Sequence, residues 1–520
     1  MEPGLLSLIP IVVAIGLALI TRQVLLSLFS GLLSAALLLH GGSLWSALMH
    51  TVDPWLLDAL ADRDHMKVTL FSLLVAATIA VSSRSGGTEA LVAIITRRAK
   101  GRRSGMVATW FAGQVVFFDD YANCLVVGTS MRPVADRLRI SREKLAYLVD
   151  STAAPVATVA LISTWVGFEV GLMDQAFSNA NLDINAYAFF LEGLPYRFYP
   201  LLALAFGLFI SVSGRDFGPM VAAEAAALAR PDVEIPEPPP TIHALLAILP
   251  IAALVGVTGA SLWTQGSAVA PEGAALFEVI GEADGYDAML HGSVVSLLLA
   301  AVMAVGAGQL TLSETSKAVI EGMTELFEAL TVLMFAWSLG SAIGDLGAAD
   351  YLLSAMGDSL PGWALPSITF ILAAAIAFAT GTSFGTMTVL MPLALPMALG
   401  MESPPGMIAL ATSSSVLSGA VWGDHCSPIS DTTVLSSTGT GCDHDAHVAT
   451  QLPYAIVVGI IAVLLGTLPA GLGVPSYIVL PLGIATCAAA VWGLGRVPAT
   501  SQPSASSLTG TGPSSHPGQT

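Results

Sequence analysis

Long apolar runs recur along almost the whole chain, beginning near Leu5 and ending near Leu494. An α-helix rises about 1.5 Å per residue, so about 20 apolar residues cross the ~30 Å hydrocarbon core of a bilayer. Only 11% of the residues are charged, whereas soluble domains carry about 25%. The pattern excludes a string of soluble domains and predicts an all-α protein that crosses a membrane many times.

About eleven of these runs are predicted to be membrane spans. The first of them has no basic segment before it and no small-residue cleavage site after it, so we interpret it as a span and not as a removed signal peptide. The predicted spans are residues 5–20, 24–39, 68–83, 145–168, 195–212, 242–263, 289–306, 318–343, 407–437, 452–472 and 477–494.

Two further apolar stretches, 106–131 and 363–397, need a separate explanation. Basic clusters flank 106–131 on both sides, and cytoplasmic loops are the ones rich in Lys and Arg. One crossing would place the clusters on opposite faces, so the stretch is predicted to be a re-entrant hairpin. The N-terminus then lies outside the cell (inner) membrane and the C-terminus in the cytoplasm. The flanking residues are Arg97, Arg98, Lys100, Arg102 and Arg103 before the stretch, and Arg132, Arg137, Arg139, Arg142 and Lys144 after it.

The order of elements repeats across a Pro-rich cytoplasmic linker at 214–241. The first half, 5–213, holds the hairpin 106–131 and an interrupted span at 145–168. The second half, 242–472, holds the hairpin 363–397 and an interrupted span at 407–437. Counterparts are an odd number of crossings apart, so two inverted repeats of five helices are predicted, a common plan of secondary transporters. An extra helix at 475–495 and a disordered tail at 496–520 follow.

Four segments carry polar side chains at positions where hydrocarbon would penalise them. Pro155 and Pro428 lie in the two interrupted spans, where each removes a helical N–H. The first hairpin holds Asp119, Asp120 and Asn123, and the second holds Thr380, Thr382, Ser383 and Thr386. The interrupted spans hold Asp150, Ser151 and Thr152 in the first half, and Asp424, His425, Ser427, Ser430, Asp431 and Thr432 in the second.

These side chains suit the binding of a hard cation and of protons. Na⁺ takes oxygen ligands from carboxylates, hydroxyls and freed backbone carbonyls, as other hard cations do. A carboxylate that binds Na⁺ when ionised and H⁺ when neutral couples the two ions by competition. A Na⁺ site is therefore predicted at Asp424, Asp431, Ser427 and Thr382, with Asp424 as the principal coupling carboxylate.

Structural roles are the alternatives for the same residues. Ser and Thr hydroxyls in spans often bond to their own helix or pack against a neighbour. Asp150 lies near the basic loop that ends at Lys144, so a salt bridge or helix cap there is the alternative. His425 is equally consistent with a proton carrier and with a hydrogen-bonded packing residue. The run 443–447 (DHDAH) is interpreted as a helix cap and solvated loop rather than a metal cluster.

Several other functions are excluded by missing patterns. The chain has no GxxxxGK[ST] loop for ATP and no H-E-x-x-H motif for a metalloprotease, so no catalytic residues and no enzyme activity are predicted. Its 19 Lys and Arg residues are scattered between spans, which argues against a nucleic-acid partner. The four cysteines have neither metal-site nor disulfide spacing.

The most unusual strings of the chain resemble the NhaC family of bacterial Na⁺/H⁺ antiporters. They are TGTSFGTMTVLMPLALP (380–396) and SGAVWGDHCSPISDTTVLSSTGTGC (418–442), with FFDDYAN and STAAPVATV as their first-half counterparts. The resemblance implies two inverted five-helix repeats, each with a re-entrant hairpin and a discontinuous helix. It also implies ion-driven transport, a homodimer in the lipid bilayer, and no cofactor beyond the transported Na⁺ and H⁺.

Members that look much like this chain do not all carry the same cargo. The first hypothesis is exchange of Na⁺ for H⁺ by alternating access. The second is a Na⁺- or H⁺-coupled carrier of a small carboxylate, of the malate/lactate type, or of an amino acid. A carboxylate cargo would favour an Arg, a half-helix N-terminus or hydroxyls as ligands. No Arg lies in the four polar segments, although Arg84 and Arg132 lie near their cytoplasmic ends. A channel or ion sensor is a third class, against which broken-helix inverted repeats argue.

Overall fold

The computed structural model of the chain describes residues 4–21, 23–96, 99–180, 182–230, 241–271, 279, 282–348, 351, 361–402 and 406–498. Every regular element within these residues is a helix, and Asp216 and Arg496 form an isolated antiparallel bridge. The predicted all-α class is confirmed. Most of the predicted Pro-rich linker (231–240), nearly all of the predicted tail (499–520), and Arg97 and Arg98 lie outside the described residues.

The first half of the chain forms helices up to residue 228. They are α1 (Ile9–Thr21), α2 (Val24–Leu39), α3 (Leu44–His50), α4 (Leu57–Ala61), α5 (Arg63–Arg84), α6 (Gly87–Thr96), α7 (Arg102–Val115), α8 (Asp120–Ala122), η3 (Asn123–Val127), α9 (Gly128–Arg137), α10 (Arg142–Asp150), α11 (Ala154–Ala157), α12 (Thr164–Asn179), α13 (Ala186–Gly193), α14 (Phe198–Ser213) and α15 (Met220–Leu228).

The second half continues in the same manner. Its helices are α16 (Leu245–Val269), α18 (Gly285–Gly306), α19 (Leu312–Glu325), α20 (Phe327–Asp345), α22 (Leu365–Thr380), α23 (Ser383–Met401), α24 (Met407–Cys426), α25 (Asp431–Thr440), α26 (His444–Ala462), η8 (Val463–Thr467), α27 (Leu468–Gly471) and α28 (Ser476–Leu494).

Eight helices of the described part are long and apolar enough to cross a membrane, or up to ten if each of two bent pairs counts as one span. The prediction of about eleven spans therefore stays a prediction. Large apolar side chains remain exposed along the outer helices, for example Leu298 and Val302 on α18 and Ile478 on α28. A surface of this kind suits contact with lipid rather than with water.

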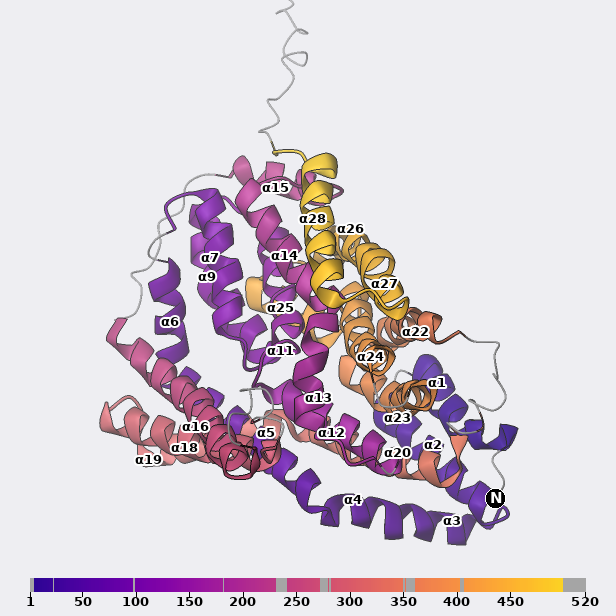
Figure 1. Ribbon diagram of the computed structural model, residues 1–520. Coiled ribbons are helices and arrows are strands. Elements are labelled where there is room, and N and C mark those ends of the chain that lie inside the picture. Colours follow the sequence, from indigo (N-terminus) through magenta and orange to yellow (C-terminus); the bar gives the residue numbers. More distant parts are fainter. Residues whose placement is uncertain are drawn as a thin grey trace, which may run out of the picture.

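The two predicted hairpin stretches each form a pair of helices around a short turn. α7 and α9 pack against each other on either side of residues 116–119, and both lie among the purple helices of Figure 1. α22 and α23 meet at Gly381 and Thr382. Gly381 has a left-handed backbone with φ of +71°, which glycine adopts without steric cost.

The two interrupted spans are broken where prolines interrupt the apolar sequence. α10 ends at Asp150, the short α11 carries Pro155, and α12 begins only at Thr164. α24 ends at Cys426, and α25 begins after a break at 427–430 that contains Pro428. Proline lacks the N–H that would continue a helix, which accounts for both positions.

The helices that start at these turns and breaks are capped by polar side chains of the same segments. Asp119 accepts a hydrogen bond from the backbone N–H of Ala122, and Ser163 accepts from two N–H groups at the start of α12. Thr382 caps α23 and Ser430 caps α25 in the same way. Part of the polarity of these apolar regions is therefore explained by capping.

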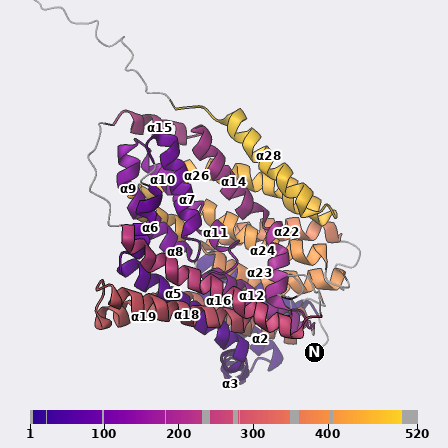
Figure 2. The same cartoon turned by 60° about the vertical axis from the view of Figure 1, so that its left-hand side comes forward.

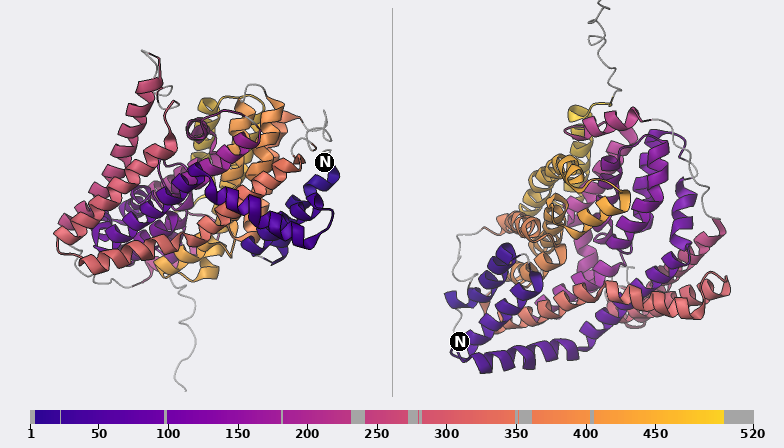
Figure 3. Two further views of the ribbon diagram at one scale, coloured as in Figure 1. Left: turned by 90° about the horizontal axis from the view of Figure 1, so that it is seen from below. Right: turned by 180° about the vertical axis from the view of Figure 1, so that it is seen from behind.

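The two halves are packed into one another. α25 of the second half contacts α10 and η3 of the first half, and α24 contacts α14. Figure 2 shows α28 lying along α14 at one edge, and Figure 3 shows the orange helices between the indigo N-terminal helices and the purple ones. Residues far apart in sequence therefore meet in the centre of the protein.

Candidate ion-binding site

The carboxylates predicted from the sequence gather between the two halves. Asp119, Asp120, Asp150 and Asp424 are buried, with exposed fractions of 9%, 3%, 0% and 3%. Asp424 lies within electrostatic range of Asp120, Asp150 and Asp431. The fully buried cations Lys144 and Arg197 are paired elsewhere, with Asp216 and Glu169.

Asp424 lies in the last turn of α24, just before the break in the second interrupted span. The Thr432 hydroxyl, in the first turn of α25, donates to Asp424 Oδ2 at 3.3 Å, and the Ser430 and Thr432 hydroxyls are 3.1 Å apart. Asp424 Oδ1 is buried and accepts no hydrogen bond from the described residues. The carboxylate thus has one oxygen held by hydroxyls and one free to take an ion or a proton.

Asp119, in the first hairpin turn, makes a comparable contact. The hydroxyl of Thr164, the first residue of α12, donates to Asp119 Oδ2 at 3.0 Å. In both halves a carboxylate therefore accepts from a threonine in the first turn of a helix that follows a break. The two arrangements are linked, because the Tyr121 hydroxyl near Asp119 donates to the exposed Asp431 of α25.

The amide nitrogen of Asn123 holds backbone carbonyls, whereas its Oδ1 is buried without a described partner and is open to a ligand. Its amide Nδ2 lies 2.8 Å from Gly113 O, 3.1 Å from Val116 O and 2.7 Å from Thr152 O. These contacts join the first hairpin turn to the break after Asp150. Asn123 therefore fixes where Asp119, Asp120 and Tyr121 lie.

Asp150 lies in a network of its own, here called the Asp150 network and made of Asp150, His425, Thr433, His447 and Gln451. Gln451 Nε2 donates to Asp150 Oδ2 at 2.5 Å, and the Thr433 hydroxyl donates at 3.2 Å. The Nε2 atoms of His425 and His447 each lie 3.9 Å from the same oxygen. The alternative of a salt bridge to the basic loop is wrong for Lys144, which pairs with Asp216 instead.

Four of the predicted hydroxyl residues bond within their own helices. The hydroxyls of Ser151 and Thr152 donate to Leu148 O at 3.3 and 2.8 Å. Those of Thr380 and Thr386 donate to Ile376 O at 2.8 Å and to Thr382 O at 3.0 Å. For these four residues the structural alternative describes what is seen.

The other predicted residues divide between the break and the second hairpin. The Ser427 hydroxyl donates to Phe378 O at 2.8 Å and so ties the break to α22. Thr382 caps α23, and the hydroxyl of Ser383 is buried without a described partner. His425 Nδ1 lies 2.9 Å from the Tyr199 hydroxyl. Of the predicted Na⁺ ligands, Asp424 and Asp431 therefore lie within electrostatic range of each other, whereas Ser427 bonds to the backbone of α22 and Thr382 caps α23.

Sequence reasoning missed Thr433, His447, Gln451 and Tyr199. The expectation that 443–447 is a cap and solvated loop was half right, because Asp443 caps α26 but His447 is fully buried. The four-residue spacing of His447 and Gln451 could have indicated that the two side chains lie together. Residues four apart share a helix face, and His447 Nε2 lies 3.1 Å from Gln451 Oε1.

A pocket of about 610 Å³ opens beside the first hairpin turn. It lies between α5, α6, η3, α19 and α25, and Tyr121, whose hydroxyl holds Asp431, forms part of its wall. Its charged lining comes from Arg84, Glu89, Glu321 and Glu325. Among the described residues no group of three or more His, Cys, Asp or Glu side chains is arranged to hold a metal ion, so hydroxyls and carbonyls would have to complete a cation site.

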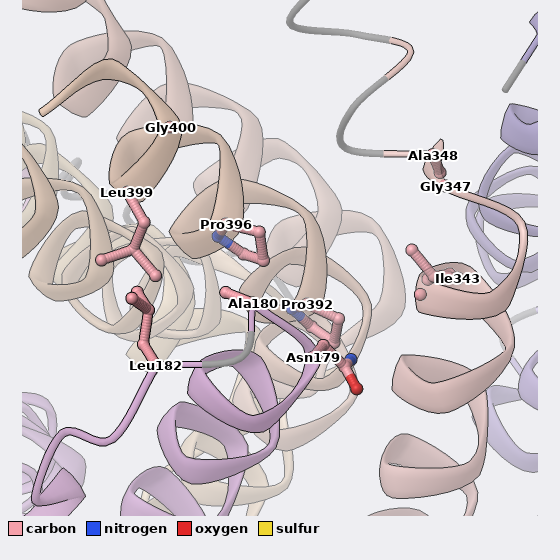
Figure 4. Close-up of a pocket in the computed structure, with 11 residues that line it drawn as sticks. Asn179, Ala180, Leu182, Ile343, Gly347, Ala348, Pro392, Pro396, Leu399 and Gly400 are labelled. Atoms are coloured by element: carbon pink, nitrogen blue, oxygen red, sulfur yellow. The ribbon is translucent and has the colours of Figure 1, made fainter. Parts of the chain in front are cut away.

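A second hollow, of about 300 Å³, contains none of the predicted site residues. It lies between α12, α20 and α23. Figure 4 shows Pro392, Pro396 and Leu399 on one side of it and Ile343 on the other. Among the described residues of its lining, no side chain is charged and Asn179 has the one polar side chain, which sets it apart from the charged pocket beside Tyr121.

Comparisons of the whole chain with solved structures find transporters. The YdaH transporter of Alcanivorax borkumensis matches with a TM-score of 0.61 at 18% identity, over 82% of this chain and 90% of that one. MtrF of Neisseria gonorrhoeae, described as belonging to a class of antimetabolite efflux pumps, matches with a TM-score of 0.56 at 14% identity, over 84% and 85%. These likenesses show the fold.

Sequence comparisons find antiporters. An uncharacterized protein of Haemophilus influenzae is 34% identical over 87% of this chain and 88% of its own length. The malate-2H⁺/Na⁺-lactate antiporter of Bacillus subtilis is 30% identical over 33% of this chain and 36% of its own length. The arginine/ornithine antiporter ArcD of Halobacterium salinarum is 29% identical over 29% of each chain.

The sequence pattern of the Na⁺/H⁺ antiporter family matches residues 156–469, which include the second hairpin, both helices of the second broken span and His447. The match covers more than half of the chain. Together with the apolar helices and the transporter fold, it makes this chain a multi-pass membrane protein and a secondary transporter that belongs to the Na⁺/H⁺ antiporter family.

Proposed function

We propose that the protein exchanges Na⁺ for H⁺ across the cell (inner) membrane by alternating access, with Asp424 as the principal coupling carboxylate. The observation that carries the proposal is the setting of Asp424. It is buried, it is held on one oxygen by Thr432, its other oxygen is free of described partners, and three further carboxylates lie within electrostatic range.

This setting suits competition between Na⁺ and H⁺. A buried carboxylate loses its hydration, and nearby carboxylates add repulsion, so its charged form is costly until a cation neutralises it. Na⁺ can do so by taking oxygens from Asp424, Ser430 and Thr432, and a proton can do so by binding to the carboxylate itself. One ion must leave before the other binds, which is the requirement of exchange.

The proposal includes the membrane layout inferred from the sequence. The two helix pairs α7–α9 and α22–α23 would be re-entrant hairpins of inverted repeats, in a homodimer with the N-terminus outside and the C-terminus in the cytoplasm. In this layout the pocket beside Tyr121 faces the cytoplasm, because it is lined by the cytoplasmic end of α5 and by α19.

Cysteine labelling tests the layout. Lys100 and Arg137 are exposed on either side of the first hairpin, and Ser43 is exposed on the predicted outer face. In a Cys442→Ala background, with the other three cysteines buried, a membrane-impermeant thiol reagent should label Ser43→Cys in intact cells. Lys100→Cys and Arg137→Cys should be labelled only after permeabilisation. Labelling of those two sites from opposite faces would contradict the hairpin.

Transport assays test the exchange itself. Purified protein in liposomes with a pH-sensitive dye should show a pH change on addition of Na⁺ without any organic solute. Li⁺ and K⁺ report selectivity, and malate, lactate and amino acids report organic cargo. A pH change that requires an organic solute would contradict the primary proposal.

A coupled carrier of a small carboxylate or amino acid is the second candidate, and the pocket beside Tyr121 favours it. Its 610 Å³ exceeds what a bare cation needs. Arg84 lies in its wall with Glu321 as ion-pair partner, so an anionic group can bind by displacing that glutamate. Arg132 is not available in this way, because it donates to Gly439 O and Thr438 O at the end of α25.

Substitution of Arg84 separates the two candidates. For an organic anion as cargo, Arg84→Gln should raise its KM about tenfold or more, since a hydrogen bond to a charged group is worth about 1.5–3 kcal/mol. Lys317→Gln is the matched control, because Lys317 is exposed and reaches the same Glu321 only at 3.8 Å. Simple exchange is supported if Arg84→Gln leaves Na⁺-driven proton movement unchanged and neither the variant nor the wild type takes up an organic solute.

A further inference from the structure

The hydrogen-bond partners of His447 are not explained by a role in cation binding. Its ring is fully buried, and both ring nitrogens face oxygen atoms. Nδ1 lies 2.8 Å from the Ser437 hydroxyl, and Nε2 lies 3.1 Å from Gln451 Oε1. A neutral imidazole has one donor and one acceptor nitrogen, whereas an imidazolium has two donors.

The partners of His447 decide which form the ring fits. Gln451 Nε2 donates to Asp150 Oδ2 and to His425 O, so its Oε1 must face His447 as an acceptor. Ser437 donates its hydroxyl hydrogen to Thr433 O at 2.7 Å, which leaves a lone pair toward the ring. Both nitrogens therefore face acceptors, and only the protonated ring donates to both.

Asp150 is the charged group that would compensate an added proton on the ring. Asp150 of α10 lies 3.9 Å from Nε2 and favours the charged ring, while His425 of α24 faces the same carboxylate and opposes it. Burial also opposes the charge. His444, one turn earlier in α26, lies 3.2 Å from the same Ser437 hydroxyl and is partly exposed. The Tyr199 hydroxyl on α14 contacts His425 and not His447.

The atoms around Asp150 suit a proton better than a hard cation. Its Oδ1 is buried without a described partner, as in Asp424, but its Oδ2 is approached by three nitrogens and one donating hydroxyl, and hard cations prefer oxygen ligands. We propose that His447 is a proton-binding site separate from Asp424, and that its protonation holds α25 and α26 of the second half against Asp150 of the first half. This inference rests on the proposed exchange only for its transport readout.

The proton step is simple in this geometry. A proton that enters from the partly exposed His444 side binds His447 Nδ1. The resulting N–H donates a hydrogen bond to the Ser437 oxygen, while the Ser437 hydrogen points to Thr433 O. On loss of the proton, the Ser437 hydrogen must turn to Nδ1, and its bond to Thr433 O is broken. The Ser437–Thr433 bond lies within α25, whereas the attraction that protonation adds joins His447 of α26 to Asp150 of α10. The pH at which exchange changes should therefore depend on His447.

The test is the pH profile of Na⁺-driven proton movement in liposomes. His447→Gln keeps a polar side chain without a titrating group, and it should flatten the profile or move its midpoint by about half a pH unit or more while leaving the KM for Na⁺ unchanged. Ser437→Ala removes an acceptor that serves the charged ring more than the neutral one, so it should move the midpoint to lower pH. His291→Gln, on exposed α18, is the histidine control.

A second readout does not depend on transport. The thermal unfolding midpoint of the detergent-purified protein should vary with pH in the wild type, and part of that variation should be missing in His447→Gln. Wild-type pH profiles of both transport and unfolding in His447→Gln would overturn the inference. A pH-dependent unfolding difference in a protein that moves no protons with Na⁺ would instead contradict the proposed exchange and leave the His447 site standing.

Discussion

We expect Na⁺-dependent proton movement to fall to the level of protein-free liposomes when Asp424 is replaced by asparagine. Asparagine has nearly the same shape and can accept the Thr432 hydrogen bond that Asp424 accepts at 3.3 Å. It cannot carry the charge that Na⁺ neutralises, and it cannot bind the exchanged proton. The loss is therefore expected without unfolding, and Asp424→Glu should keep weak activity with an altered affinity for the cation.

The measurement is dye quenching in liposomes across a range of Na⁺ concentrations, with the amount of folded protein checked by gel filtration. Asp58→Asn is the control, because Asp58 is an exposed carboxylate on α4. Exchange at the wild-type rate and affinity in Asp424→Asn would place the coupling elsewhere. The buried pair Asp119 and Asp120 would then be the leading candidate.

Leucine at Gly381 is also expected to abolish transport, for a reason that lies in the backbone. A Cβ at this position would lie 2.6 Å from Ile429 O, in the break that precedes α25, and φ is +71°. A left-handed conformation costs a residue with a Cβ roughly 1–2 kcal/mol, and the contact must in addition push residues 427–430 away. Ser430 and Thr432 would move with that break, so the surroundings of Asp424 would be lost.

Gly473→Leu separates strain from contact. Gly473 has a φ of +87°, but nothing lies within 4 Å of a Cβ built there. The Gly473→Leu variant should therefore lose some stability and keep its transport activity. The Gly381→Leu variant should reach the membrane but transport nothing. Retained transport in Gly381→Leu would mean that the second hairpin turn does not support the ion site.

The helices were largely predictable because each depends on local sequence. The predicted span 24–39 coincides with α2, and the predicted span 477–494 differs from α28 by one residue. Apolar runs mark helices in a membrane protein, and Pro155 and Pro428 lie at the two broken spans, whereas Pro250 and Pro453 lie inside continuous helices. The all-helical class follows from the apolar runs.

The pairings of the site could not be predicted, because they join residues far apart in the chain. Asp150 meets Thr433 and Gln451 across 283 and 301 positions, and Tyr121 meets Asp431 across 310. Sequence identified most of these carboxylates as unusual but contained no information on their partners. His447 shows a second limit of prediction from sequence. The polar run 443–447 is predicted to be a solvated loop, but it begins a helix whose periodicity turns His447 toward the interior.

The half-helices that begin beside Asp119 and Asp424 bear on how tightly the transporter avoids leaks. The start of a helix carries partial positive charge worth about 0.3–1 kcal/mol to a nearby anion. Burying an ion without a partner costs several kcal/mol. The starts of α12 and α25 can therefore offset only part of the cost of burying the empty, charged carboxylates. A carrier without a bound ion would then rarely switch between its outward-facing and inward-facing states. Movement of one ion down its gradient without the other would be rare, so the two fluxes would stay coupled.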